Sequence, residues 1–219
     1  MDFNDLIANG YVFLPQFRPG ETALSIANEI GTISAIPSIP IVQRISPKEA
    51  IKSTPNVYSG NFGLDAFPLH TDLAHWHVSP RFIVLRCVEP APEVSTFLLP
   101  FSKVIETVDS LTIERALFRP RRKCGGRLAL LRLRQEIQGS SMFRWDELFL
   151  KPSNVLGVEV AKLLKEISQD GNSPAVVFSR LYDTLVIDNW SMLHGRSIVP
   201  SWAVNRTLDR VYLRSLKNE

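Results

Sequence analysis

The sequence contains little cysteine and no long apolar run. Its 219 residues include two cysteines, Cys87 in an apolar segment and Cys124 just before two glycines. Two such cysteines form neither a disulfide framework nor a C-x-x-C metal clip, so we expect two free thiols. No apolar stretch reaches the roughly 18 residues of a transmembrane helix, and the first residues lack the basic flank and apolar stretch of a signal peptide. These absences predict a soluble cytoplasmic protein with no membrane association.

An excess of charge of one sign is also absent. The chain has 25 Lys and Arg against 22 Asp and Glu, giving a net charge of +3. This charge is too small to indicate a nucleic-acid-binding protein by itself. With 45% hydrophobic and 21% charged residues, the composition is typical of a globular chain with a sizeable core. We therefore expect one domain over residues 1–219.

Short runs of β-branched and aromatic residues dominate the second half of the chain. Helical spacing is restricted to residues 2–10, residues 20–31, where Gly31 suits a C-terminal cap, and residues 154–172, where Ser153 or Asn154 is the expected N-cap and Gly171 lies near the end. Many short strands with few helices predict an all-β sandwich or barrel with helical additions. The expected strands are residues 11–17, 81–88, 95–101, 126–137, 175–189 and 207–216.

Three of the four histidines lie in "FPLHTDLAHWH", residues 67–77. His70 and Asp72 are two positions apart, so on a strand their side chains face the same way and can point at one ion. The remaining histidine, His194, follows the strand-like "DTLVIDN". Two histidines and one carboxylate on one face of a metal form the facial triad of non-haem Fe(II) oxygenases. An H-x-D pair alone is a weak signal, so the metal site is at this point a hypothesis.

Three ordered segments carry a resemblance to a known family. They are "PLHTDLAHWHVSPRFIVLRCVEPAPEVSTFLLP", "LVIDNWSMLHGRSIVP" and "NRTLDRVYLRSL". Together they resemble the taurine dioxygenase and clavaminate synthase-like family of Fe(II)- and 2-oxoglutarate-dependent oxygenases. The resemblance implies a mainly β chain with flanking α-helices, folded as a double-stranded β-helix (jelly roll), with His70, Asp72 and His194 as the iron ligands. Residues 103–138 carry no part of it.

The resemblance also implies a reaction and its cofactors. It implies a dioxygenase that uses Fe(II), 2-oxoglutarate and O2 to oxidise, by hydroxylation, an unactivated C–H bond of a small, anionic or amino-acid-like substrate. It assigns Arg206 to an ion pair with the distal carboxylate of 2-oxoglutarate and Thr96 to a hydrogen bond with the same group. A guanidinium can bind a carboxylate through two parallel hydrogen bonds, and a hydroxyl adds a third donor. The carboxylate of Asp72 disfavours halogenation, because halogenating relatives carry a small residue there.

Arg206, Arg210 and Arg214 are spaced by four, which a solvated helix would also show. The segment is rich in β-branched and aromatic residues, so a strand is at least as good an interpretation. On a strand the three face one way, and buried arginines need anionic partners. We expect Arg210 to contact an anionic group of the substrate, as family members do, and Arg214 to be a surface or structural residue.

Other residues near the histidines receive more modest roles. Four histidine ligands would close the open metal face, so we place His75 and His77 at the pocket rim or in structural packing, with substrate contact as the alternative. Trp76 is an apolar wall for the substrate or part of the core. For Arg196 we expect structural hydrogen bonds, and we interpret residues 188–189 as a turn that positions the strand carrying His194.

Two segments, residues 56–67 and 139–152, are candidate covers of the site, because relatives commonly carry longer insertions there. A small cover would admit a carrier-bound substrate, or a second subunit could complete it in an oligomer. The alternative function is a jelly-roll binding protein without oxygenase activity, which could bind a polyanion through the arginine-rich segment Arg119–Arg134. Against this, a strand there would point its leucines inward and its arginines to solvent.

Overall fold

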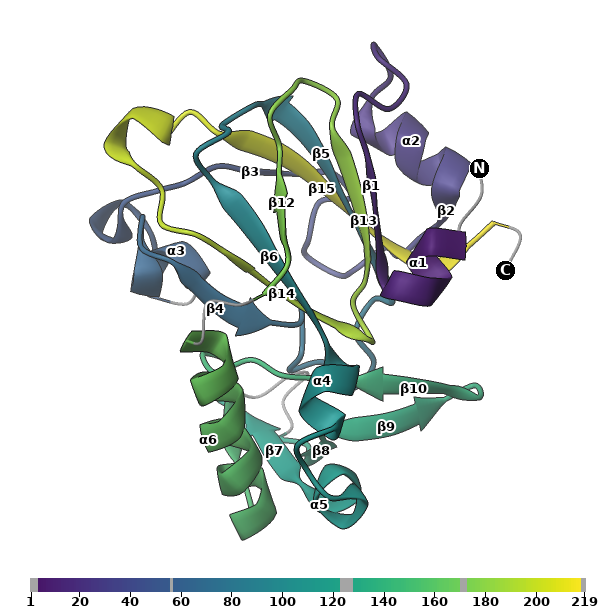
Figure 1. Ribbon diagram of the computed structural model, residues 1–219, viewed down its shortest axis with the longest axis vertical. Helices are drawn as coiled ribbons and strands as arrows, with labels where there is room; N and C mark the ends of the chain where they lie inside the picture. The colour runs from purple at the N-terminus through teal and green to yellow at the C-terminus, as the bar shows by residue number, and fades with distance from the viewer. Residues whose placement is uncertain (1–3, 56, 123–127, 170–172, 218–219) are drawn as a thin grey trace.

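The computed structural model describes residues 4–55, 57–122, 128–169 and 173–217. These residues form antiparallel sheets with short helices around them (Figure 1). Two large sheets face each other in the upper part of Figure 1, and a smaller layer of strands and helices extends below them. The prediction of one domain stays a prediction.

The first large sheet has the order β1-β13-β5-β15-β2, with β3 also paired to β15. Side chains of β5 and β15 alternate between its two faces, because successive residues of a strand point to opposite sides. Val84 and Val211 pack toward helix α2, whereas Leu85 and Leu208 pack into the space between the two large sheets. The strands are β1 (Tyr11–Leu14), β2 (Gly31–Ile33), β3 (Gln43–Ile45), β5 (Phe82–Glu89), β13 (Thr184–Asp188) and β15 (Thr207–Leu216).

The second large sheet has the order β12-β6-β14-β4. Leu98 of β6 and Met192 of β14 meet Ile83, Leu185 and side chains of β15 in one apolar cluster, so the two sheets enclose a common core. This is the layered arrangement of a jelly roll. The strands are β4 (Phe67–His70), β6 (Ser95–Pro100), β12 (Ala175–Val177) and β14 (Met192–Arg196).

The lower layer in Figure 1 contains two small sheets and three helices. Phe118, Leu131, Trp145 and Leu164 form part of its own apolar cluster, which continues to Leu69 of β4. This layer therefore packs against the end of the strand that carries His70. Its elements are β7 (Leu117–Pro120), β8 (Leu131–Arg132), β9 (Arg134–Ile137), β10 (Ser140–Phe143), β11 (Leu150–Pro152), α4 (Phe101–Ile105), α5 (Ser110–Arg115) and α6 (Val155–Gln169).

The remaining helices flank the upper sheets. Helix α2 packs Ile26 and Ile30 against the outer face of the first sheet, and the side chain of Thr22 caps its start by accepting a hydrogen bond from the Ser25 amide. Among the described helices, none has both the length and the apolar composition that crossing a bilayer requires. The elements are α1 (Asn4–Asn9), α2 (Ala23–Ile30), α3 (Tyr58–Phe62) and the 3-10 turns η1 (Ala50–Lys52) and η2 (Ser201–Ala203).

The helix ends confirm one expected cap and correct another. Asn154, not Ser153, caps α6, because its side-chain oxygen accepts a hydrogen bond from the Gly157 amide at 2.8 Å. Gly31 does end α2, but its backbone is extended, with φ of −164°, and it begins β2. A Cβ atom there would lie 2.2 Å from the carbonyl oxygen of Ser215, so the close approach of β15 requires the glycine. Gly171 lies outside the described residues.

Candidate metal centre

His70 and Asp72 do not lie on one continuous strand as predicted. Strand β4 ends at His70, and Asp72 lies in the turn that follows. The chain turns because Leu73 adopts a left-handed conformation, with φ of +55°, which is uncommon for a residue other than glycine. The turn directs the Asp72 side chain back toward His70.

His194 lies within strand β14, not directly after β13 as predicted. Residues 189–191 form the turn between the two strands, so the turn expected at Asp188 and Asn189 includes Asn189, whereas Asp188 is the last residue of β13. In the antiparallel pairing of β14 with β4, His194 is directly opposite His70, and their ring centroids are 4.5 Å apart. Strand pairing therefore brings together two histidines that are far apart in the sequence.

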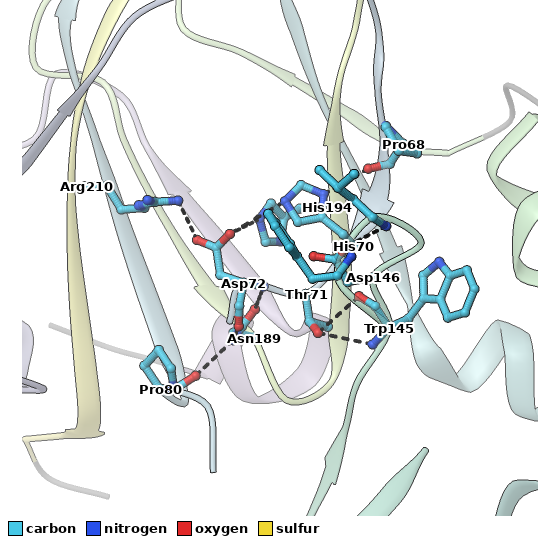
Figure 2. A network of polar contacts seen from close by, with 12 residues as sticks. Pro68, His70, Thr71, Asp72, Pro80, Trp145, Asp146, Asn189, His194 and Arg210 are labelled. Atoms are coloured by element: carbon cyan, nitrogen blue, oxygen red, sulfur yellow. Dashed lines mark hydrogen bonds and ion pairs between the residues drawn. The ribbon is translucent and has the colours of Figure 1, made fainter. Parts of the chain in front are cut away.

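The three side chains converge on one point between the two large sheets (Figure 2). Oδ1 of Asp72 lies 3.5 Å from Nε2 of His70 and 3.6 Å from Nε2 of His194. One ligand atom from each residue lies within 4.8 Å of the others, and all three residues are buried. Two imidazole nitrogens and one carboxylate oxygen in such a cluster form a donor set for a divalent transition metal.

A metal binds histidine through a neutral ring nitrogen, and the two histidines differ in their pKa shifts. Nδ1 of His70 lies 2.9 Å from the carbonyl oxygen of Pro68, so a proton on Nδ1 leaves the lone pair on Nε2, facing Asp72. Burial, together with the neighbouring His70, lowers the pKa of His194, which keeps its ring neutral. Burial alone would lower the pKa of His70 too, but Asp72 outweighs it and raises this pKa.

The two oxygens of Asp72 have different partners. Oδ2 accepts hydrogen bonds from Nη1 of Arg210 at 2.8 Å and from the hydroxyl of Tyr212 at 2.8 Å, while Oδ1 faces the histidines (Figure 2). Burial would raise the pKa of Asp72, but Arg210 and the histidines hold it well below its usual range. The carboxylate is therefore ionised and held by one oxygen. Sequence patterns did not reveal Tyr212, whose own pKa is raised well above its usual value by burial and by Asp72.

Asn189 fixes the backbone of Asp72. Its Oδ1 accepts a hydrogen bond from the Asp72 amide at 2.7 Å, and its Nδ2 donates to the Asp72 carbonyl at 3.0 Å and to the Pro80 carbonyl at 2.9 Å. The side chain is completely buried. The expected turn is thus confirmed at Asn189, although Asp188 ends β13, and the hydrogen bonds that hold the aspartate in place were not predicted.

Arg206 and Thr96, the two residues predicted to bind 2-oxoglutarate, lie side by side. Nη2 of Arg206 donates to the hydroxyl of Thr96 at 3.3 Å, and Arg206 and Thr96 are 6% and 4% exposed. Among the described residues, no carboxylate forms an ion pair with Arg206, and its Nε has no hydrogen-bond partner. Burial lowers the pKa of Arg206 to about 10. A buried cation with so few partners favours an anionic ligand.

Strand register places Thr96 close to the three candidate ligands. Leu98 of β6 is directly opposite His194 of β14, and Thr96 is two positions further along β6, on the same face. Two residues of a strand span roughly 7 Å. Thr96, and with it the Arg206 guanidinium that it contacts, therefore lies on the same sheet face as His194, a short way along β6.

Arg210 and Arg214 lie on strand β15 and Arg206 immediately precedes it, so the alternative of a helical stripe is wrong. Arg210 faces the metal centre from β15, where Nη1 contacts Asp72 and Nη2 donates to Oε1 of Gln43 at 2.7 Å. Contact with a substrate anion is therefore not shown for Arg210, and this role stays a prediction. Arg214 is exposed to solvent, as expected for a surface residue.

Both predicted covers contribute an aromatic ring near the candidate ligands: one ring stacks on His70, and the other packs against that ring. Tyr58 of α3 stacks on His70 with 4.2 Å between ring centroids, and Phe149 lies 5.8 Å from the Tyr58 ring and 5.4 Å from the His75 ring. His75 and Trp76 are half-buried, whereas His77 is exposed. The structure thus places His75 next to the cover, as the rim position requires, and substrate contact by His75 or Trp76 stays a prediction.

Two further arginines stabilise this region without binding a carboxylate. Arg196 donates to the carbonyls of Gly63 and Asp65, which confirms its predicted structural role. Arg144, which the sequence did not single out, is 1% exposed and donates to the carbonyls of Ala74, Trp76 and His77. It therefore fixes the loop that follows Asp72.

A second buried carboxylate, Asp146, lies on the histidine side of Asp72 and away from Arg210 (Figure 2). Its Oδ1 accepts hydrogen bonds from the amides of Leu148 and Phe149, both at 2.8 Å. Burial raises the pKa of Asp146 to about 6, although nearby His70 and these hydrogen bonds oppose the shift. The two acidic residues thus have opposite pKa shifts, because only Asp72 has an arginine partner.

The arginine-rich segment Arg119–Arg134 is only partly described, since residues 123–127 fall outside the described part of the chain. The prediction that its leucines point inward is half correct: two leucines are buried, and the two that precede β8 are exposed. Arg134 donates hydrogen bonds to the side chains of Glu136 and Ser141. Of the two cysteines, Cys87 is a buried free thiol and Cys124 lies outside the described residues. Polyanion binding stays a prediction. The buried leucines are Leu131 and Leu133, and the exposed ones are Leu128 and Leu130.

No family model matches the sequence. No curated protein matches it either. Among solved structures, PvcB from Pseudomonas aeruginosa aligns with 98% of this chain and 82% of its own, at 18% identity and a TM-score of 0.68. A second PvcB structure is described as an Fe- and alpha-ketoglutarate-dependent oxygenase from an isonitrile synthetic pathway.

Two other oxygenases have similar structures. Asparagine oxygenase in complex with Fe(II), 3-hydroxyasparagine and succinate aligns with 79% of this chain at 18% identity and a TM-score of 0.62. The non-haem iron oxygenase OrfP, in complex with Fe, succinate and (3S)-hydroxy-L-Arg, aligns with 79% at 16% identity and a TM-score of 0.60. The chain spans 56% of the length of each of these two proteins. The likeness confirms the predicted jelly roll.

Proposed function

We propose that this chain is a non-haem Fe(II)- and 2-oxoglutarate-dependent dioxygenase that oxidises, by hydroxylation, a C–H bond of a small, amino-acid-like substrate. The observation that carries the proposal is the pairing of two sites in one core. His70, Asp72 and His194 form a donor set for a cation, and the buried Arg206 contacts Thr96, which lies two positions from the partner of His194 on β6. A site for the metal alone would have no use for the arginine.

The donor set fits Fe(II). Two imidazoles and one carboxylate bound on one side of the ion leave its other coordination positions open, as oxygenases of this type require. No thiolate takes part, because the cluster contains no cysteine. Iron held there would supply the redox chemistry that couples decarboxylation of 2-oxoglutarate to oxidation of a C–H bond. The protein supplies the position of its ligands, through Asn189 and the Pro68 carbonyl.

Arg206 and Thr96 would bind the distal carboxylate of 2-oxoglutarate. Among the described residues, the guanidinium has one hydrogen bond, of 3.3 Å, to Thr96. A carboxylate would accept two charge-assisted hydrogen bonds from it and one from the threonine hydroxyl. Because the site is buried, these bonds are not weakened by competing water. Binding of the cosubstrate thus compensates a buried charge that is costly without it.

The substrate class rests on the similar structures and on the walls of the site. Asparagine oxygenase and OrfP were solved with hydroxylated amino acids, and here Tyr58 stacks on His70 with the ring of Phe149 beside it. Arg210 is the candidate residue for an anionic group of the substrate, and His75 and Trp76 are candidates for its side chain. Attachment of the substrate to a carrier and assembly of the chain into oligomers stay predictions.

The test is formation of succinate from 2-oxoglutarate by protein loaded anaerobically with Fe(II) and then exposed to air. We expect turnover that a chelator abolishes, that His194→Ala and Arg206→Met both lose, and that one or more compounds from a panel of amino acids stimulate. Arg214→Met, at an exposed arginine of the same strand, is the matched control and should retain turnover. Failure of the iron-loaded protein to bind 2-oxoglutarate or to form succinate would overturn the proposal.

A further inference from the structure

Tyr212 lies on the inward face of β15 and reaches the metal centre from the opposite sheet. It is 3% exposed, and its hydroxyl donates to Oδ2 of Asp72 at 2.8 Å. The two residues are 140 positions apart in the sequence. The contact therefore depends on the packing of the first large sheet against the turn that carries Asp72.

The hydroxyl group is not needed to fill the core. Tyr212 packs in an apolar cluster with Ile83, Leu185 and Ile187, where a phenylalanine would occupy nearly the same volume. A buried hydroxyl is unfavourable unless it forms a hydrogen bond. Among the described residues, the only hydrogen bond recorded for this hydroxyl is the one to Asp72. The hydrogen bond to Asp72 therefore explains why this position has a tyrosine hydroxyl, whereas packing alone does not.

Arg210 and Tyr212 both donate to Oδ2 of Asp72, but Arg210 also forms a second hydrogen bond. Its Nη2 donates to Gln43, which lies directly opposite in the pairing of β15 with β3. Arg210 thus connects the aspartate to the edge of the sheet and supplies a charge. The Tyr212 hydroxyl approaches the same oxygen from a rigid ring with few rotatable bonds, so together the two donors fix the plane of the carboxylate.

The orientation of this plane decides how Asp72 can bind an ion. With Oδ2 held by two donors, only Oδ1 faces the imidazole nitrogens, at 3.5 and 3.6 Å. A carboxylate bound through one oxygen leaves three positions of a six-coordinate ion open, whereas one bound through both oxygens leaves two. A 2-oxoglutarate that chelates through two oxygens and an additional oxygen ligand need all three.

We propose that Tyr212 is a positioning residue of the metal centre, whose hydroxyl occupies Oδ2 of Asp72 and so presents Oδ1 alone to the ion. The proposal rests on the proposed function only in requiring that His70, Asp72 and His194 bind a divalent metal. It adds that Tyr212, a residue of β15, determines how many coordination positions of the ion stay open and hence the affinity for 2-oxoglutarate.

The test compares wild type with Tyr212→Phe, and with Tyr11→Phe as the matched control, since Tyr11 packs against the same apolar cluster. Each protein is titrated with Co(II), and 2-oxoglutarate is then titrated into the Co(II) complex. We expect Tyr212→Phe to weaken metal binding by about 10- to 100-fold, as for other partners of metal ligands. We also expect a changed visible Co(II) spectrum and weaker 2-oxoglutarate binding, with thermal unfolding close to that of Tyr11→Phe.

Each outcome bears on the proposal. Unchanged Co(II) affinity and spectrum in Tyr212→Phe would overturn it, even if the wild type is an active oxygenase. Failure of the wild type to bind Co(II) would overturn it as well. A wild type that binds Co(II) and shows the expected loss in Tyr212→Phe, yet forms no succinate with iron, would support the role of Tyr212 and contradict the oxygenase function. If Tyr212→Phe does not fold, Tyr212→Met in the same titrations replaces it.

Discussion

Arg86 on β5 and Arg206 just before β15 are both buried, at 2% and 6% exposure. The guanidinium of Arg86 donates to the carbonyls of four residues and to one hydroxyl, whereas that of Arg206 donates only to the Thr96 hydroxyl, at 3.3 Å. Burial lowers the pKa of both arginines. The acceptors of Arg86 are the carbonyls of Phe17, Arg18, Glu21 and Tyr182 and the hydroxyl of Thr184.

The difference in hydrogen-bond partners indicates that Arg86 contributes to stability and that Arg206 is available for ligand binding. A buried charge is tolerated only where polar groups replace its lost hydration. Around Arg86 the protein supplies these groups itself, and the arginine connects the segment before α2 to the start of β13. Around Arg206 the described residues supply one such group, the Thr96 hydroxyl. The other N–H donors of Arg206 are therefore available to a ligand. Two residues of the same type and similar burial should therefore respond to substitution in opposite ways.

Replacement of Arg86 should give the largest effect, and the effect should be on stability. Arg86→Met leaves several buried carbonyls without a donor, so we expect unfolding to become easier by about 3 to 5 kcal/mol. For a chain of this size that corresponds to a decrease of roughly 10 °C in the unfolding temperature. Urea and thermal unfolding measure it. At low temperature the folded variant should bind 2-oxoglutarate as wild type does, and loss of that binding would break the comparison.

Replacement of Arg206 should have the reverse effect. Arg206→Met removes the cation that would pair with a buried carboxylate, so we expect 2-oxoglutarate affinity to fall by about 100-fold or more. Stability should change by less than about 1 kcal/mol, because few native hydrogen bonds are lost. Calorimetric titration measures the affinity. In thermal unfolding, 2-oxoglutarate should raise the midpoint of the metal-loaded wild type but not of the variant. A loss of stability equal to that of Arg86→Met would show that both arginines are structural.

The sequence predicts only those features of the two regions that depend on residues close together in the chain. The strands that became β5, β6 and β15 were predictable, because each is a short run rich in β-branched, aromatic and other apolar residues. His70 and Asp72 were recognisable as a pair because they are only two positions apart in the sequence. Their placement on one strand was wrong, since the left-handed turn at Leu73 leaves no mark in a pattern of residue types.

The partners of Asp72 could not be predicted for a physical reason. Asn189 and Tyr212 are 117 and 140 positions away, and each is an ordinary residue in its own segment, one in a turn and one on an apolar strand face. Their roles arise only when the two sheets pack. Arg206 differs, because a resemblance to a known family can name a residue whose geometry no local pattern indicates.

Removal of the Thr96 hydroxyl should have a smaller effect on the same ligand. Thr96→Val keeps the shape of the side chain but removes the one hydrogen bond of Arg206 and a donor for the carboxylate. Because one hydrogen bond to a charged group contributes about 1 to 2 kcal/mol, we expect 2-oxoglutarate affinity to fall by roughly 5- to 30-fold. The same calorimetric titration measures it. An unchanged affinity would place the carboxylate away from Thr96 and would weaken the assignment of Arg206.

The smallest effect is expected at Arg214, four positions from Arg210 on the same strand. Arg214 is exposed and lies at the point where the pairing of β15 with β2 shifts register, between Leu213 and Ser215. Arg214→Met should change stability by less than about 0.5 kcal/mol and leave 2-oxoglutarate affinity unchanged. Unfolding and calorimetry measure both. Arg214→Met and Arg206→Met each replace an arginine with methionine. A difference in 2-oxoglutarate affinity between them must therefore come from the burial and the hydrogen-bond partners of the two arginines. Equal losses would mean that the net charge, and not the buried pocket, attracts the ligand.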